Sequence, residues 1–159
     1  MPIMLSGIEG IRACVGFNLG HSDWMEVDQA MLACFESLSV DGLRMQTTGS
    51  RERQVPCAVL LALVIPMLQE IYVIEDTLDF TLCGVEQLHF LLPVPANTGL
   101  RIGAAVKEVR PVDDHWQLTL ACVMECDTLT KPVLRADVLY QFRTRSRTPM
   151  PQLSLCRSE

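Results

Sequence analysis

Apolar and polar positions along the chain separate an early helical part from a later run of strands. From Met31 to Leu38 the apolar residues recur at helical spacing, and Asp28 stands where a helix cap is expected. Residues 56–72 are apolar on nearly every face, so they predict a helix that is buried all round. Residues 1–20 predict an irregular segment, because four glycines interrupt any long element.

Four later segments have the pattern of strands, most clearly where polar or small residues alternate with apolar ones between Trp116 and Cys126. Turns rich in proline, glycine and aspartate separate them. The predicted strands are residues 78–92, 99–110, 116–126 and 133–143. Helices followed by antiparallel strands indicate an α+β fold, in which a curved antiparallel sheet wraps around the apolar helix.

The length and net charge of the chain indicate how many domains it has and which partners it does not favour. A chain of 159 residues with 49% hydrophobic and 20% charged residues fits one globular domain. Its net charge of −6 does not favour nucleic acid or an anionic membrane as partner. The first residues lack the features of a secretory signal, and no apolar run is long enough to span a bilayer. We expect a cytoplasmic protein with an irregular segment at 1–20, a domain at 21–143 and a tail at 144–159.

Cysteine and histidine placement does not favour a metal site. The seven cysteines form no C-x-x-C pair, so we expect buried, reduced thiols. The three histidines are scattered, and none lies close to a pair of cysteines. We therefore expect no metal and no other cofactor.

Several stretches, taken in order, resemble the motifs of one family. The L-G-H-S-D-W of residues 19–24 resembles an L-G-x-S-D-W opening, and the H-F-L-L-P-V-P of residues 89–95 resembles an R-F-x-x-P-V-P strand and turn. Further matches are a helix end at 34–41, a helix start at 55–63 and a late strand at 132–137. By these residues the chain resembles the MaoC-like (R)-specific enoyl-CoA hydratases and dehydratases, most of all their nodulation-protein-N branch, over residues 19–143.

The resemblance implies a hot-dog fold that binds an acyl thioester of CoA or of acyl carrier protein. It also implies a homodimer, or a heterodimer with another hot-dog protein. In the family, an Asp and a His in the pattern D-x-x-x-x-H add water to the enoyl thioester or remove it. The carbonyl of the thioester is held by a backbone N–H at the start of the central helix.

Carried over residue by residue, the catalytic motif is incomplete. Asp41 matches the catalytic aspartate, but Gln46 stands where the histidine is expected, and glutamine cannot transfer a proton at neutral pH. Cys57 replaces a second histidine, and Ala58, followed by Val59, replaces the glycine whose N–H holds the carbonyl.

Each of these catalytic candidates also has a simpler interpretation. Asp41 with Gly42 forms a common turn sequence, and Gln46 is a polar residue in a polar loop. Cys57 is either a small buried residue or, because a helix N-terminus lowers a thiol pKa, a nucleophile. The basic residues around them are a solvated loop or a clamp for phosphates of CoA or for an acidic carrier protein. They are Arg44, Arg51 and Arg53.

Three hypotheses about function follow. The first is a divergent dehydratase-like enzyme centred on Asp41, in which Gln46 orients water. The second is a non-catalytic hot-dog subunit that binds an acyl chain or pairs with an active MaoC-like partner. The third is an isomerase, a thioester hydrolase or a cyclase on the same scaffold, since a fold does not determine a reaction.

Overall fold

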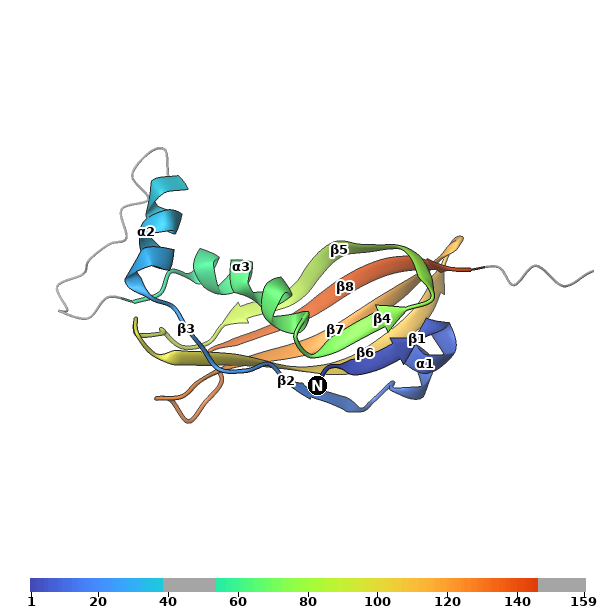
Figure 1. Ribbon diagram of the computed structural model, residues 1–159, viewed down its shortest axis with the longest axis horizontal. Coiled ribbons are helices and arrows are strands. Elements are labelled where there is room, and N and C mark those ends of the chain that lie inside the picture. The colour runs from blue at the N-terminus through green and yellow to red at the C-terminus, as the bar shows by residue number, and fades with distance from the viewer. Residues whose placement is uncertain (39–53, 146–159) are drawn as a thin grey trace, which may run out of the picture.

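A curved six-stranded sheet dominates the fold and lies against helix α3 (Cys57–Leu68), as Figure 1 shows. In this computed structural model, which describes residues 1–38 and 54–145, the strand order is β2–β6–β7–β8–β5, and β3 pairs with β6. All of these pairings are antiparallel. The strands are β2 (Asn18–His21), β3 (Met25–Glu26), β5 (Thr77–Phe90), β6 (Gly99–Val112), β7 (His115–Cys126) and β8 (Leu134–Thr144). The expected α+β arrangement of a curved sheet around an apolar helix is confirmed.

The four predicted strands correspond to β5, β6, β7 and β8. A two-residue turn, Asp113–Asp114, joins β6 to β7, and Asp113 has φ 53°, a conformation that aspartate tolerates in tight hairpins. The pairing of β5 with β8 shifts register at three points, which is typical of bulges that bend a strand. These bends let the outer strand follow the curvature of the sheet.

Two of the three helices in the described residues were predicted. Helix α2 (Gln29–Leu38) begins after Asp28, whose carboxylate accepts a hydrogen bond of 2.9 Å from the N–H of Met31 and so caps the helix as expected. Helix α3 begins after Pro56 and ends at Leu68. The sequence pattern extended this helix to residue 72, but the chain has already entered strand β4 (Tyr72–Glu75) there. Among the described residues, no helix is both long and apolar enough to cross a membrane.

The prediction of an irregular segment at 1–20 is wrong. Strand β1 (Ile3–Ser6) pairs in parallel with β4, helix α1 (Gly7–Ala13) follows it, and β2 joins the main sheet. Gly7 and Gly20, with φ of 62° and 107°, adopt conformations that favour glycine. Gly7 begins α1 directly after the end of β1. This glycine therefore separates two short elements and does not indicate an irregular segment. Of the predicted tail, residues 146–159 lie outside the described residues.

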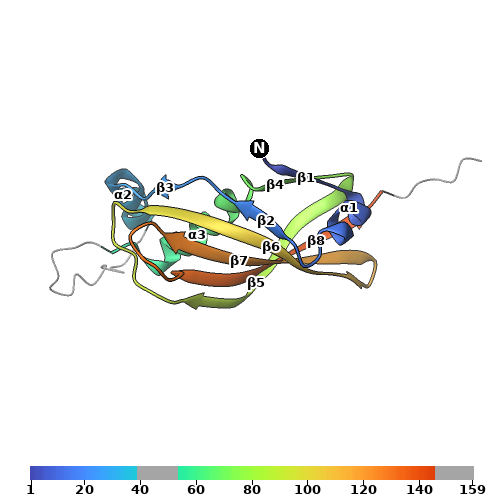
Figure 2. The same ribbon diagram turned by 90° about the horizontal axis from the view of Figure 1, so that it is seen from below.

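Helix α3 is covered by the sheet on one side only. Figure 2 views the sheet with α3 behind it. The buried side chains on the helix are Val59, Leu60, Val64, Met67 and Leu68. The opposite face is exposed at Cys57, Ala58, Leu61, Ala62 and Pro66. The prediction of all-round burial is therefore wrong for the described chain, because a single sheet encloses only one face of a helix.

The cysteines follow the same division between inside and outside. Cys122 and Cys126 point into the core and are buried free thiols, as expected. Cys34, Cys57 and Cys83 are exposed, which corrects the expectation that the thiols are buried. Their strands and helices have apolar sequences, but each of these three side chains lies on a face that no described element covers.

Candidate functional site

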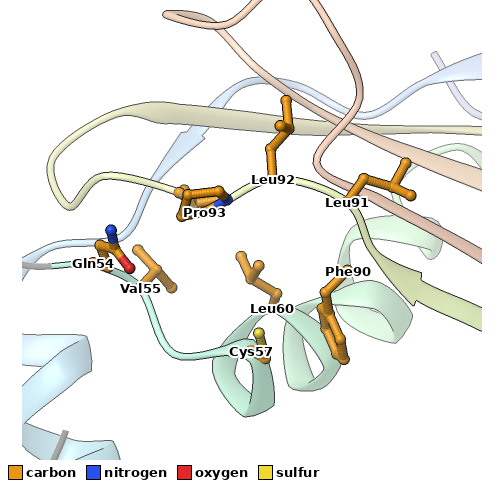
Figure 3. Close-up of a pocket in the computed structure, with 9 residues that line it drawn as sticks. Gln54, Val55, Cys57, Leu60, Phe90, Leu91, Leu92 and Pro93 are labelled. Atoms are coloured by element: carbon orange, nitrogen blue, oxygen red, sulfur yellow. The ribbon is translucent and has the colours of Figure 1, made fainter. Parts of the chain in front are cut away.

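A pocket of about 220 Å³ lies at the N-terminus of α3 (Figure 3). One wall is the segment that enters the helix, and the other is the end of β5 with the chain that follows it. The lining residues are Gln54, Val55, Cys57, Leu60, Phe90, Leu91, Leu92, Pro93 and Val94. All except Gln54 and Cys57 are plainly apolar, so the pocket suits a hydrocarbon group.

Backbone hydrogen bonds hold the two walls in place. The N–H of Val55 donates to the carbonyl oxygen of Val94 at 2.8 Å, and Gln54 forms an isolated bridge with Pro95. On the far side, the N–H of Leu91 donates to the carbonyl oxygen of Val133 at 2.8 Å. The shape of the pocket is therefore determined by main-chain bonds as well as by side-chain packing.

The first turn of α3 presents backbone donors beside this pocket. The N–H groups of Val59 and Leu60 donate to the carbonyl oxygen of Pro56, at 3.0 and 3.2 Å. Within the described part of the chain, the N–H groups of Cys57 and Ala58 have no partner, and no side chain caps the helix. A helix N-terminus with free N–H groups carries partial positive charge and attracts a negatively polarised oxygen.

The structure separates the two predicted carbonyl-binding residues. Ala58 keeps a free N–H one residue after Cys57, which lines the pocket. The N–H of Val59 is already bonded to Pro56, and its side chain is buried in the core. The N–H of Val59 is therefore not free to hold a carbonyl oxygen. The same role for the N–H of Ala58 stays a prediction.

Cys57 is exposed, and Figure 3 shows its sulfur on the pocket side of the helix. Among the described residues, no hydrogen bond or ion pair reaches this thiol, so the nucleophile interpretation has no base in this part of the chain. The remaining predicted residues lie outside the described residues, and their roles stay predictions. They are Asp41, Arg44, Gln46, Arg51 and Arg53.

The second wall of the pocket was not assigned to the site by sequence reasoning. Phe90 to Val94 belong to the H-F-L-L-P-V-P stretch, which was noted as a family motif but given no role. The sequence feature that could have indicated this wall is the run of apolar residues, bounded by proline, directly after a strand. Such a run marks a wall only once the fold has brought it beside Val55, which is distant in sequence.

A buried polar cluster was also missed, and it lies outside the pocket. Tyr72 and Tyr140 are buried and share a side-chain hydrogen bond, and Tyr140 stacks on Phe80 with ring centroids 4.7 Å apart. Burial is the main cause that raises the pKa of Tyr72, and the bond to Tyr140 adds to it. Burial, followed by the nearby Asp137, raises the pKa of the Cys122 thiol to about 12. These groups stay neutral and belong to the core.

Comparison with known proteins identifies the fold. No protein-family model and no curated protein sequence matches the chain. Solved structures do match. An Archaeoglobus monoamine oxidase regulatory protein superposes with a TM-score of 0.71 at 16% identity, covering 91% of this chain and 98% of that one. A MaoC-like dehydratase from Rhodospirillum rubrum gives 0.66 at 16% identity, covering 87% and 97%.

A third structure, the (R)-hydratase from A. caviae involved in PHA biosynthesis, superposes with a TM-score of 0.60 at 17% identity, covering 79% of this chain and 96% of that one. At these identities the likeness concerns the fold rather than the reaction. The resemblance seen in the sequence is thus matched by the architecture: this chain has the hot-dog fold of the MaoC-like dehydratase and (R)-hydratase structures.

Proposed function

We propose that the chain binds an acyl thioester of CoA or of acyl carrier protein and processes it in a dehydratase-like reaction centred on Asp41. One observation carries the proposal: an apolar pocket opens where α3 begins, beside the free N–H groups of Cys57 and Ala58. An apolar pocket suits the acyl chain. Backbone donors suit the thioester oxygen, which gains negative charge as an enolate develops.

In this proposal each part of the site has one task. The acyl chain lies against Leu60 and Phe90, and the N–H of Ala58 holds the thioester oxygen. Asp41 transfers a proton, and Gln46 orients the water that is added or lost. Arg44, Arg51 and Arg53 hold the phosphates of CoA or the acidic face of a carrier protein. The structural neighbours named dehydratase and (R)-hydratase support a reaction that adds or removes water.

The missing histidine predicts a slow enzyme. A positioned general acid or base contributes about 10²–10⁴-fold to rate, and Gln46 supplies neither function. The remaining acceleration must come from Asp41 and from the backbone donors of α3. We therefore expect turnover well below that of an enzyme with a complete D-x-x-x-x-H motif.

Hydration of crotonyl-CoA, followed by loss of the enoyl-thioester absorbance, tests the proposal. We expect slow hydration by the native chain, none by Asp41→Asn and at least a tenfold gain by Gln46→His. Asp113→Asn, which changes a carboxylate in the distant β6–β7 turn, is the matched control and should leave the rate unchanged. No hydration by the native chain, together with activity in Gln46→His, would show that the native protein is not a hydratase.

The second candidate is a non-catalytic subunit that pairs with another hot-dog protein, either a second copy or an active partner. Two unpaired apolar surfaces favour it. The outer face of α3 exposes Leu61 and Ala62. Strand β5 pairs only with β8 among the described strands, yet it exposes Leu78 and Leu82 at 41% and 43%. A long edge strand with exposed apolar side chains is a surface at which another chain can pair.

Mass measured by light scattering tests the pairing. We expect a dimer, and we expect Leu82→Asp to shift it to a monomer because a carboxylate disfavours burial at the pairing edge. Lys131→Asp, in the turn before β8, is the control and should leave the dimer intact. If the native chain is a monomer, binding to a co-expressed MaoC-like protein with an intact D-x-x-x-x-H motif distinguishes a heterodimer from an unpaired chain.

A further inference from the structure

Leu60 lines the pocket on the side of the buried core. This side chain is 2% exposed, and in Figure 3 it points from α3 toward the segment that contains Leu91 and Pro93. Val64 and Leu68 lie one and two turns further along the same side of the helix and are buried at 1% and 0%. Beyond Leu60, therefore, the space between α3 and the sheet is filled by side chains.

The walls around Leu60 are less free to move than Leu60 itself. Val55 is bonded through its backbone to Val94, and Leu91 is bonded through its backbone to Val133. A longer ligand cannot widen the pocket at these points without breaking main-chain hydrogen bonds. The side chain of Leu60 is the group whose size determines how deep the pocket extends.

The volume limits the length of an occupant. An apolar cavity of about 150 Å³ holds a six-carbon ring, and this pocket has about 220 Å³. By that proportion it has room for roughly eight carbons if every part is filled. A chain much longer than this must displace Leu60 or leave its end in water.

We propose that Leu60 is the specificity-determining residue of the site and that the pocket accepts straight acyl chains of up to about eight carbons. The inference rests on the proposed function for the thioester, but the limit itself depends only on the pocket. It predicts that each added methylene strengthens binding about fourfold until the limit is reached, and that further methylenes add nothing.

Titration calorimetry with two series of probes tests the limit. One series is straight-chain S-acyl-N-acetylcysteamine thioesters of two to twelve carbons, and the other is n-alkanols of the same lengths. For the native protein we expect affinity to level off near eight carbons. For Leu60→Ala we expect the plateau to move two to three carbons higher, and for Leu60→Val about one.

Leu61→Ala is the matched control, because Leu61 is the next residue on α3 but faces away from the pocket. It should leave the plateau where it is. Leu60→Val keeps the test decisive if Leu60→Ala does not fold, and circular dichroism verifies the fold of each variant.

The two series separate the inference from the proposed function. A plateau in both series that moves with Leu60 supports the inference. If the thioesters bind no more tightly than the alkanols but the plateau still moves, the inference holds and the proposed function fails. Thioester-selective binding without a plateau, or with one that Leu60 does not move, overturns the inference alone. Binding of neither series overturns both.

Discussion

The backbone N–H of Val55 lies 2.8 Å from the carbonyl oxygen of Val94, and this hydrogen bond joins the two walls of the pocket. Both side chains are buried. The bond positions the entry to α3 against the chain that follows β5, so it also determines where the free N–H groups of Cys57 and Ala58 lie. The geometry of the candidate site depends on this contact between two segments that are far apart in sequence.

Amide hydrogen exchange measured by NMR tests that arrangement. We expect slow exchange at Val55, whose N–H is buried and bonded, and fast exchange at Ala58, whose N–H has no partner among the described residues. Addition of a butyryl thioester should slow exchange at Ala58 if its N–H holds the carbonyl. Val59, already bonded to Pro56, is the internal control and should change little.

Fast exchange at the Val55 N–H would contradict the hydrogen bond that joins the two walls of the pocket. Slow exchange at Ala58 without ligand would show that its N–H already has a partner, and the carbonyl-binding role would then lose its donor.

Thiol alkylation tests whether ligands enter beside Cys57. Iodoacetamide should modify the exposed Cys57 and Cys83 readily and the buried Cys122 slowly, since access controls thiol reactivity. A butyryl thioester should protect Cys57, which lines the pocket, and leave Cys83 unprotected. Mass spectrometry of peptides measures both rates. Equal protection of the two thiols, or of neither, would contradict binding at this pocket.

The buried thiol of Cys122 predicts a loss of stability at high pH. Its pKa is about 12 in the folded chain, against an ordinary value of 9.0. Above pH 9 the unfolded chain releases this proton while the folded chain keeps it, so ionisation favours unfolding. Stability from this group is fully present below pH 9 and is lost progressively up to pH 12, by about 2–3 kcal/mol near pH 11.

Urea unfolding of Cys122→Ala between pH 8 and pH 11 measures this effect. We expect the variant to be less stable at pH 8, because it leaves a cavity, but to lose less stability as the pH rises. Cys83→Ala, which removes an exposed thiol, is the control and should keep the native slope. Parallel slopes for the native chain and Cys122→Ala would show that this thiol does not titrate as its burial predicts.

We expect Gly20 in the L-G-H-S-D-W motif to be required for its backbone conformation rather than for a chemical role. Its φ of 107° is a conformation that other residues rarely adopt, so Gly20→Ala should lower the free energy of unfolding by about 1–3 kcal/mol. Gly84→Ala is the matched control, because an added Cβ there meets nothing within 4 Å. Thermal unfolding measures both variants. An equal effect of the two substitutions would contradict the conformational explanation.

Much of the fold could be predicted from local patterns. Asp28 caps its helix because an aspartate before an apolar periodic segment satisfies free backbone donors. The alternating residues of β7 place Leu118, Leu120 and Cys122 in the core, as period-two alternation requires. Strands β1 and β4 were missed because each has four residues, too few for periodicity to distinguish from a loop or a helix end.

The site was predicted less completely, for a physical reason. Cys57 and Ala58 were found because they stand at a helix start, which is a local feature. The opposite wall depends on the register that brings Val94 beside Val55, and no local pattern encodes that contact. The exposure of Leu61 also escaped prediction, because an apolar face is equally consistent with burial in the domain and with burial against a partner.

The most direct test of the central claim is a crystal structure with a non-hydrolysable analogue of butyryl-pantetheine, in which an amide replaces the thioester and keeps its carbonyl oxygen. The account predicts that the acyl chain lies between Leu60 and Phe90 and that its carbonyl oxygen lies within hydrogen-bonding distance of the Ala58 N–H. An acyl chain bound elsewhere on the chain, or a carbonyl directed away from the start of α3, would contradict it.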